Sequence, residues 1–212
     1  MTFTELRQMV RREIIVDQYE DAYTNSDIEE VLWKASLDIA SAFDIPRAIG
    51  SQEVPVNATS IALVAPIRRL HTLQIAGDDG VSVDLVTVWR MRGVSPGPLR
   101  YFNFDPRRST NVEVAPASFG GTAFFEYTPP LQRPGNLLAA QPWNGVLSEF
   151  HNAIAYRAGV TLFEMAERQD EAQHWSEQYQ LRSSELALFL GRTDMANLMI
   201  QPEARDDPGS QG

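Results

Sequence analysis

The chain has 212 residues, of which 43% are hydrophobic and 22% charged, a composition that suits one globular domain or two small, closely packed ones. It contains no cysteine, which excludes disulfides, thiolate metal sites and cysteine nucleophiles. The formal net charge of -10 opposes non-specific binding to nucleic acid, because such binding depends on Lys and Arg. No apolar run approaches the roughly 20 residues that span a bilayer, so we expect a soluble protein made in the cytoplasm.

Two amphipathic helices are predicted at the N-terminus. Thr2 and Glu5 have the spacing of a capping box, and the apolar residues that follow recur at helical intervals, which predicts a helix over about 4–15. Ser26 and Glu29 repeat the capping pattern ahead of a second apolar series, which ends before the next proline.

The region from 49 to 141 has a different texture, with short β-branched and aromatic runs separated by Gly, Pro and Asp. Strands are predicted over 53–57, 61–64, 67–75, 81–92, 99–105, 111–115 and 122–127. The sequence Gly77-Asp-Asp-Gly80 predicts a hairpin turn, because Asp and Gly tolerate a positive φ. No alternation of strands and helices occurs, so we expect an antiparallel sheet.

The helical period returns after Pro142. One long helix is predicted as far as about Arg168, and its small residues permit close approach of another helix. A second helix is predicted from about Asp170 to a stop at Gly191.

The last residues of the chain divide into an apolar patch and a polar end. The final ten residues have the composition of a disordered terminus. The patch before them holds four large apolar side chains: Met195, Leu198, Met199 and Ile200. Two interpretations stay open, a docking arm for a partner or an extra turn packed on its own domain.

These elements predict an α+β fold. The N-terminal helices, residues 1–48, and the long C-terminal helices, residues 142–191, form a helical bundle. An antiparallel β domain, residues 49–141, is inserted between them. Residues 192–212 form an extended C-terminal arm that is partly disordered when free.

Few residues offer catalytic chemistry. Glu171 and His174 form one Glu-x-x-His pair on a helix, but the di-iron bundles that use this unit need a second such pair. Further glutamates lie nearby in the sequence: Glu149, Glu164 and Glu167. We expect a solvated helix face, with no metal, no cofactor and no enzymatic activity, and a helical-bundle metal enzyme stays as the alternative.

Two basic clusters lie in the β region. The first comprises Arg68, Arg69, Arg90 and Arg92, and the second comprises Arg107 and Arg108, which follow Tyr101-Phe-Asn-Phe104. Arginines interleaved with aromatic residues can bind single-stranded nucleic acid. The overall acidity instead favours arginine–carboxylate pairs at subunit contacts, or ordinary surface charge.

Three C-terminal segments follow one another in a distinctive order. A strand ends in Phe125-Glu-Tyr-Thr-Pro-Pro130, an Ala-rich helix contains residues 150–164, and a second helix opens with residues 170–179. The N-terminal helices, residues 6–14 and 27–43, have a matching placement. This arrangement resembles the head-to-tail adaptor, or connector, proteins of tailed bacteriophages.

The resemblance implies a structural protein in the neck of the virion, made in the host cytoplasm. Several copies, commonly twelve, would form a ring beneath the portal protein and connect the DNA-filled head to the tail. The implied partners are the portal protein, a tail or nozzle protein and further copies of the chain. DNA would pass through the lumen without sequence-specific binding, and acidic walls would keep it from sticking.

The resemblance also implies that the C-terminal patch, Met195, Leu198, Met199 and Ile200, docks on the portal protein. Two alternatives stay open beside the metal enzyme. One is another neck or tail-completion protein of the same particle. The other is a small-ligand module that uses the β region as its pocket.

Overall fold

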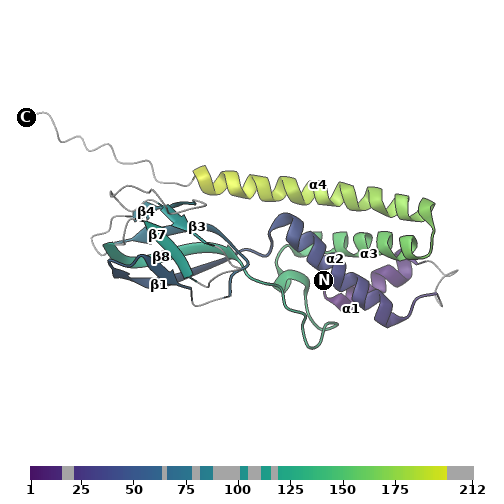
Figure 1. Ribbon diagram of the computed structural model, residues 1–212. Coiled ribbons are helices and arrows are strands. Elements are labelled where there is room, and N and C mark those ends of the chain that lie inside the picture. Colours follow the sequence, from purple (N-terminus) through teal and green to yellow (C-terminus); the bar gives the residue numbers. More distant parts are fainter. Residues whose placement is uncertain are drawn as a thin grey trace, which may run out of the picture. The chain divides into compact units, whose positions relative to one another are not determined.

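The computed structural model describes residues 1–15, 22–63, 66–77, 82–87, 101–104, 111–115 and 119–199, with the backbone alone at 82–84, 86–87, 101, 115, 119 and 192–199. Contacts divide the chain into two units, Met1–Ser36 with Asn136–Gly212, and Leu37–Gly135. We call the first the helical unit and the second the β unit (Figure 1). The first division falls within a helix, whereas the sequence predicted divisions at 48/49 and 141/142.

The helices and strands confirm the α+β class. The helices are α1 (Phe3–Met9), the π-helix η1 (Val10–Ile14), α2 (Asn25–Phe43), the 3-10 turns η2 (Pro142–Gly145) and η3 (Ser148–Phe150), α3 (Asn152–Met165) and α4 (Gln169–Met199). Among the described residues, no helix is both long and apolar enough to cross a membrane.

The first predicted capping box is confirmed. The Thr2 hydroxyl accepts a hydrogen bond from the Glu5 amide at 3.3 Å, and the Glu5 carboxylate accepts one from the Thr2 amide at 2.6 Å. The predicted first helix is split, because α1 passes into the π-helix at Val10.

The second predicted capping box, Ser26 with Glu29, is wrong. Thr24 and Asp27 form the box, with the Thr24 amide 2.9 Å from the Asp27 carboxylate and the Asp27 amide 3.2 Å from the Thr24 hydroxyl. They have the same three-residue spacing two positions earlier. Glu29 instead forms an ion pair with Arg7 at 2.6 Å, which joins α2 to α1.

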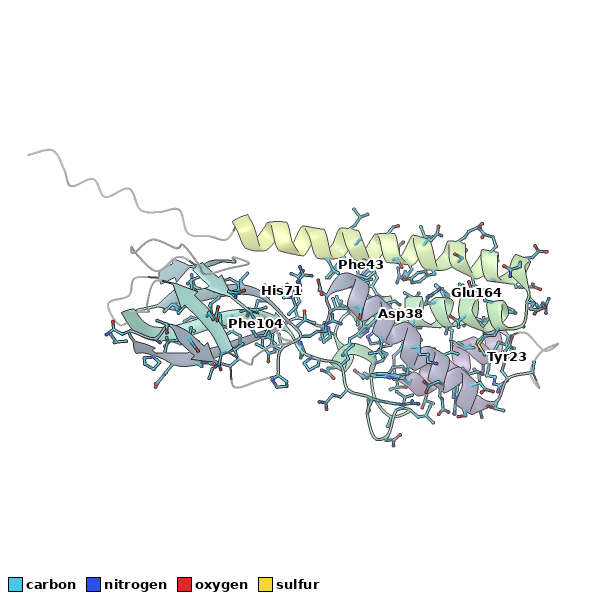
Figure 2. All side chains as sticks on the ribbon, in the orientation of Figure 1. Tyr23, Asp38, Phe43, His71, Phe104 and Glu164 are labelled. Atoms are coloured by element: carbon cyan, nitrogen blue, oxygen red, sulfur yellow. The ribbon has the colours of Figure 1, made fainter. Side chains whose placement is uncertain are left out.

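Small residues let α3 pack closely in the helical unit. Ala153, Ala155 and Ala158 are fully buried. A Cβ atom added to Gly159 would lie 2.8 Å from the Ile14 side chain, so η1 approaches α3 as closely as a glycine allows. The Tyr23 hydroxyl donates to the Leu162 carbonyl of α3 at 2.6 Å, and burial raises the pKa of this tyrosine (Figure 2).

The long helix predicted after residues 142–144, with Val146 as its first apolar position, begins later than expected, at Asn152. Trp143, Asn144 and Leu147 have φ values of 51°, 58° and 57°, which a right-handed helix cannot accommodate. The buried Trp143 indole donates to the Ser36 carbonyl of α2 at 3.1 Å. This left-handed turn is thus accompanied by a tertiary contact with a residue 107 positions earlier in the sequence.

The β unit contains two sheets, each with four strands among the described residues. The order in the first sheet is β1 (Ala48–Val56), β8 (Phe119–Thr128), β3 (Arg69–Ala76) and β4 (Ser82–Asp84). The order in the second sheet is β2 (Ser60–Ala62), β7 (Asn111–Ala115), β6 (Tyr101–Asn103) and β5 (Val86–Thr87).

The two sheets share one apolar core. Both contribute buried side chains to it, including Leu73, Ile75 and Phe125 from the first sheet and Phe102 and Val112 from the second. Consecutive strands change sheet at both edges, from β1 to β2 and from β4 to β5. The chain therefore connects the sheets at both edges of the sandwich.

The antiparallel prediction holds for every described strand pair except β5 with β6, which is parallel. A parallel pair needs a crossover longer than a hairpin turn, and residues 88–100 connect these two strands. The hairpin predicted around residues 77–80 is confirmed by the antiparallel pairing of Ala76 with Ser82. Residues 78–81 of that turn lie outside the described residues.

Candidate functional site

The C-terminal helical hairpin carries the residues predicted to dock on a partner. Helix α3 has 14 residues and α4 has 31, so at about 1.5 Å per residue they are roughly 21 Å and 46 Å long. The two pack against each other along α3 (Figure 1). The C-terminal half of α4 therefore extends past the helix on which it packs.

Aromatic contacts hold α4 on the preceding residues. Trp175 stacks on Tyr156 of α3 with ring centroids 5.6 Å apart, and Phe189 meets Phe150 of η3 at 5.5 Å. Leu186, between these contacts, is fully buried. Trp175 and Leu186 therefore lie on the face of α4 that packs on the preceding residues, whereas Phe189 stays 41% exposed.

Arg182 fastens the middle of α4. Its Nε donates to the Asn152 side chain at 3.0 Å, its Nη2 donates to the Glu149 carbonyl at 2.6 Å, and its guanidinium lies 5.1 Å above the Phe150 ring. It also forms an ion pair with Glu185. A hollow of about 270 Å³ lies beside it, and the two charged groups at its wall already neutralise each other.

The opposite face of α4 exposes apolar side chains. The side chains of Leu181 and Leu188 are 60% and 63% exposed, although leucine is a residue type that is often buried. They are seven residues apart, which places them on one line along the helix. Met195 occupies the next position of the same seven-residue series. We call this series, Leu181, Leu188 and Met195, the α4 stripe.

The predicted stop of this helix at Gly191 is wrong, and so is the extended arm over residues 192–199, because α4 continues to Met199. A stop at glycine requires a positive φ, which Gly191 does not adopt. Met195, Leu198 and Met199 therefore lie on a helix, and Ile200 lies outside the described residues.

The sequence patterns did not predict Leu181 and Leu188 as partner-binding residues. The signal that could have found them is the seven-residue spacing that both share with Met195. In the β unit, Ile49 is 84% exposed and Phe124 is 43% exposed. These two belong to neighbouring strands β1 and β8, and only their exposure in the sheet distinguishes them from core residues.

The histidine-containing pair on α4 makes contacts with its own sequence neighbours. Glu171 forms an ion pair with Arg168, and the exposed His174 ring meets the Trp175 ring edge-on at 5.1 Å. Within the described part of the chain, no group of three His, Asp or Glu residues could hold a metal ion.

The other two histidines make hydrogen bonds within their own units. Burial lowers the pKa of His151, whose Nε2 lies 3.0 Å from the Val146 carbonyl. Burial, and next the charge of Arg47, lower the pKa of His71, whose Nε2 lies 2.7 Å from the Thr128 hydroxyl (Figure 2). The His151 Nδ1 also lies 3.1 Å from the Met1 carbonyl, so each ring joins chain segments that are far apart in sequence.

The first basic cluster is engaged within the chain. Arg68 and Arg69 both form ion pairs with Asp44, and Arg68 also donates to the Ala40 carbonyl near the end of α2 at 3.0 Å. This is an arginine–carboxylate arrangement within one chain, at the end of a helix. The remaining predicted members, Arg90, Arg92, Arg107 and Arg108, lie outside the described residues.

No protein-family model and no curated protein sequence matches this chain. Among solved structures, it is similar to a chain of one titled "Neck of empty GTA particle computed with C6 symmetry". The two have 14% sequence identity and a TM-score of 0.27, over 75% of this chain and 76% of that one. A TM-score this low does not establish a common fold, so a functional assignment rests on the residues of this chain.

Proposed function

We propose that the chain is a structural subunit of the neck of a tailed bacteriophage or a related particle, and that it acts as the head-to-tail adaptor. The observation that carries this proposal is the exposure of Leu181 and Leu188 in the α4 stripe, on a helix whose other face is already packed. A surface of this kind is typical of a protein that works by assembling with others.

The portal protein is the proposed partner of the C-terminal end of α4. Met195, Leu198 and Met199 lie on the helix beyond the part held by α3, and Ile200 follows directly. Because the backbone there is helical, docking would place a helix in an apolar groove of the portal protein. This replaces the extended arm expected from the sequence.

The assembled form is proposed to be a ring, commonly of twelve copies, with the portal protein on one side and a tail or nozzle protein on the other. The net charge of -10 would be multiplied around such a ring. Acidic walls repel the phosphate backbone, so DNA would pass through the lumen without sequence-specific binding. The proposal includes no enzymatic activity and no cofactor.

Binding of the purified chain to a purified portal ring tests the proposal. Replacing Met199→Asp puts a charge among the docking residues and should weaken binding at least about tenfold. Asn197→Asp introduces the same side chain at a polar position of the same helix and should leave binding unchanged.

Equal binding by both variants would contradict the docking assignment. Binding to a tail protein but not to the portal would identify the chain instead as another neck or tail-completion protein of the particle. Negative-stain images of the chain with portal should show a ring of added density if the adaptor proposal is correct.

A further inference from the structure

The α4 stripe is a second apolar face on a helix that already has one. Ala172 and Leu186 bury the first face against the helical unit, whereas Leu181 and Leu188 lie in water. An amphipathic helix packed on one neighbour normally presents polar residues elsewhere. The exposed leucines therefore form an apolar face that no other part of the described chain covers.

Charges along the same line indicate which partner suits this face. At 3.6 residues per turn, Glu177 lies one turn before the leucines and Arg192 lies one turn after them, on the side of α4 that holds the stripe. Glu185, between the leucines, is already neutralised by its ion pair with Arg182. The line therefore runs from acidic, through apolar, to basic.

We propose that the α4 stripe binds the α4 stripe of a second copy of this chain, with the two helices antiparallel about a two-fold axis near Ser184. Leu181 of each copy then lies opposite Leu188 of the other copy. Glu177 of each copy faces Arg192 of the other copy. The small side chain of Ser184 and the absence of one at Gly191 permit the helices to approach closely.

A parallel pair would not satisfy the same charges. It would place Glu177 beside Glu177 and Arg192 beside Arg192, in a chain that already has a net charge of -10. Antiparallel helices also oppose their dipoles favourably. Charge complementarity thus selects the antiparallel arrangement.

The helix pair goes beyond the proposed neck function and does not rest on it. A two-fold contact joins identical patches, whereas neighbours in a ring join different patches. The pair is therefore a form of the free chain, in which the exposed leucines of one copy are covered by those of the other.

The mass of the full chain, measured by light scattering or sedimentation over a wide concentration range, tests the pair. The unaltered chain and Ala187→Glu, a charge added at an exposed position off the stripe, should form dimers. Leu188→Glu should weaken the dimer at least about tenfold, with an unchanged circular dichroism spectrum because Leu188 is exposed. A monomer at every concentration, or an equal effect of both substitutions, would overturn the proposal.

Charge reversal tests the antiparallel register. Glu177→Arg alone and Arg192→Glu alone should each weaken the dimer, and the double variant should restore it. A double variant as weak as either single variant would refute the register.

Cross-linking tests the position of the axis. The chain has no cysteine, so Ser184→Cys gives one thiol per copy. It should form a covalent dimer on oxidation faster than Gln180→Cys, which lies off the stripe on the same exposed helix. Equal rates would place the axis elsewhere and overturn the arrangement. Portal binding is a separate readout, so failure of the dimer and failure of the neck assignment are distinguishable.

Discussion

The helical unit and the β unit expose apolar side chains in different patterns. On α4, the exposed Leu181 and Leu188 are seven residues apart on one side of the helix. The charged residue between them, Glu185, forms an ion pair with Arg182. On β1 and β8, the exposed Ile49 stands opposite Glu126, which pairs with Arg47 at 3.4 Å. The first pattern continues along one helix and suits a partner helix, whereas in the second a charged residue stands directly opposite the exposed isoleucine.

The two units also use their glycines differently. In the β unit, a Cβ added to Gly121 would lie 2.1 Å from the Ala76 carbonyl oxygen, and Gly121 has a φ of +118°. In the helical unit, the nearest atom to a Cβ on Gly159 belongs to the Ile14 side chain. A backbone cannot yield as a side chain can, so the β unit should tolerate such a change less well.

The largest expected effect is that of Gly121→Ala. The clash with the Ala76 carbonyl and the unfavourable φ should together lower the free energy of unfolding by more than about 3 kcal/mol. Gly135→Ala, where nothing lies within 4 Å of the added atom, should change it little. Denaturant unfolding followed by circular dichroism measures both, and equal midpoints would contradict the close approach of β8 to β3.

Gly159→Ala should have the next largest effect, about 1–3 kcal/mol, because the buried Ile14 side chain must shift to accept the new methyl group. Gly191→Ala, measured at a concentration at which the chain is monomeric, is its control on the neighbouring helix. There the added methyl meets open space, and higher helix propensity should stabilise the chain by up to about 1 kcal/mol. If Gly159→Ala stabilised the chain as well, the tight contact between α3 and η1 would be refuted.

The corrected capping box gives a smaller effect. Thr24→Ala removes the hydroxyl that accepts from the Asp27 amide and should cost about 1 kcal/mol in unfolding free energy. Ser26→Ala, at the position predicted from sequence, should be neutral. The reverse order in thermal unfolding would restore the original assignment.

The smallest effect concerns pH. The pKa of His151 is lowered in the folded chain, so below the ordinary value of about 6.5 the unfolded chain binds more protons and stability falls. His71 in the β unit has a shift in the same direction and should act likewise. His151→Gln should reduce the fall in the free energy of unfolding between about pH 6.5 and the lowered pKa of that histidine. His71→Gln should likewise reduce the fall that His71 causes. Unchanged pH profiles for both variants would show that neither ring is held neutral.

Much of the fold could be predicted because local patterns specify local elements. Alternating and helical spacing located the strands and the helices, and the Thr2 and Glu5 box was correct because both residues act within one turn. The predicted start of the long helix near Val146 failed because Leu147 has a φ of 57°, next to a turn whose Trp143 indole donates to the Ser36 carbonyl, far away in the sequence. The stop at Gly191 failed because a glycine ends a helix only where its φ is positive.

The sequence by itself therefore determined the element types, the α+β class, the absence of cysteine chemistry and the apolar residues near the C-terminus. Only the tertiary structure decided how the strands divide into two sheets, that β5 and β6 are parallel, and which face of α4 is left in water. The reason is physical. Periodicity shows that a helix has an apolar position, but whether that position is buried depends on partners that other parts of the chain supply.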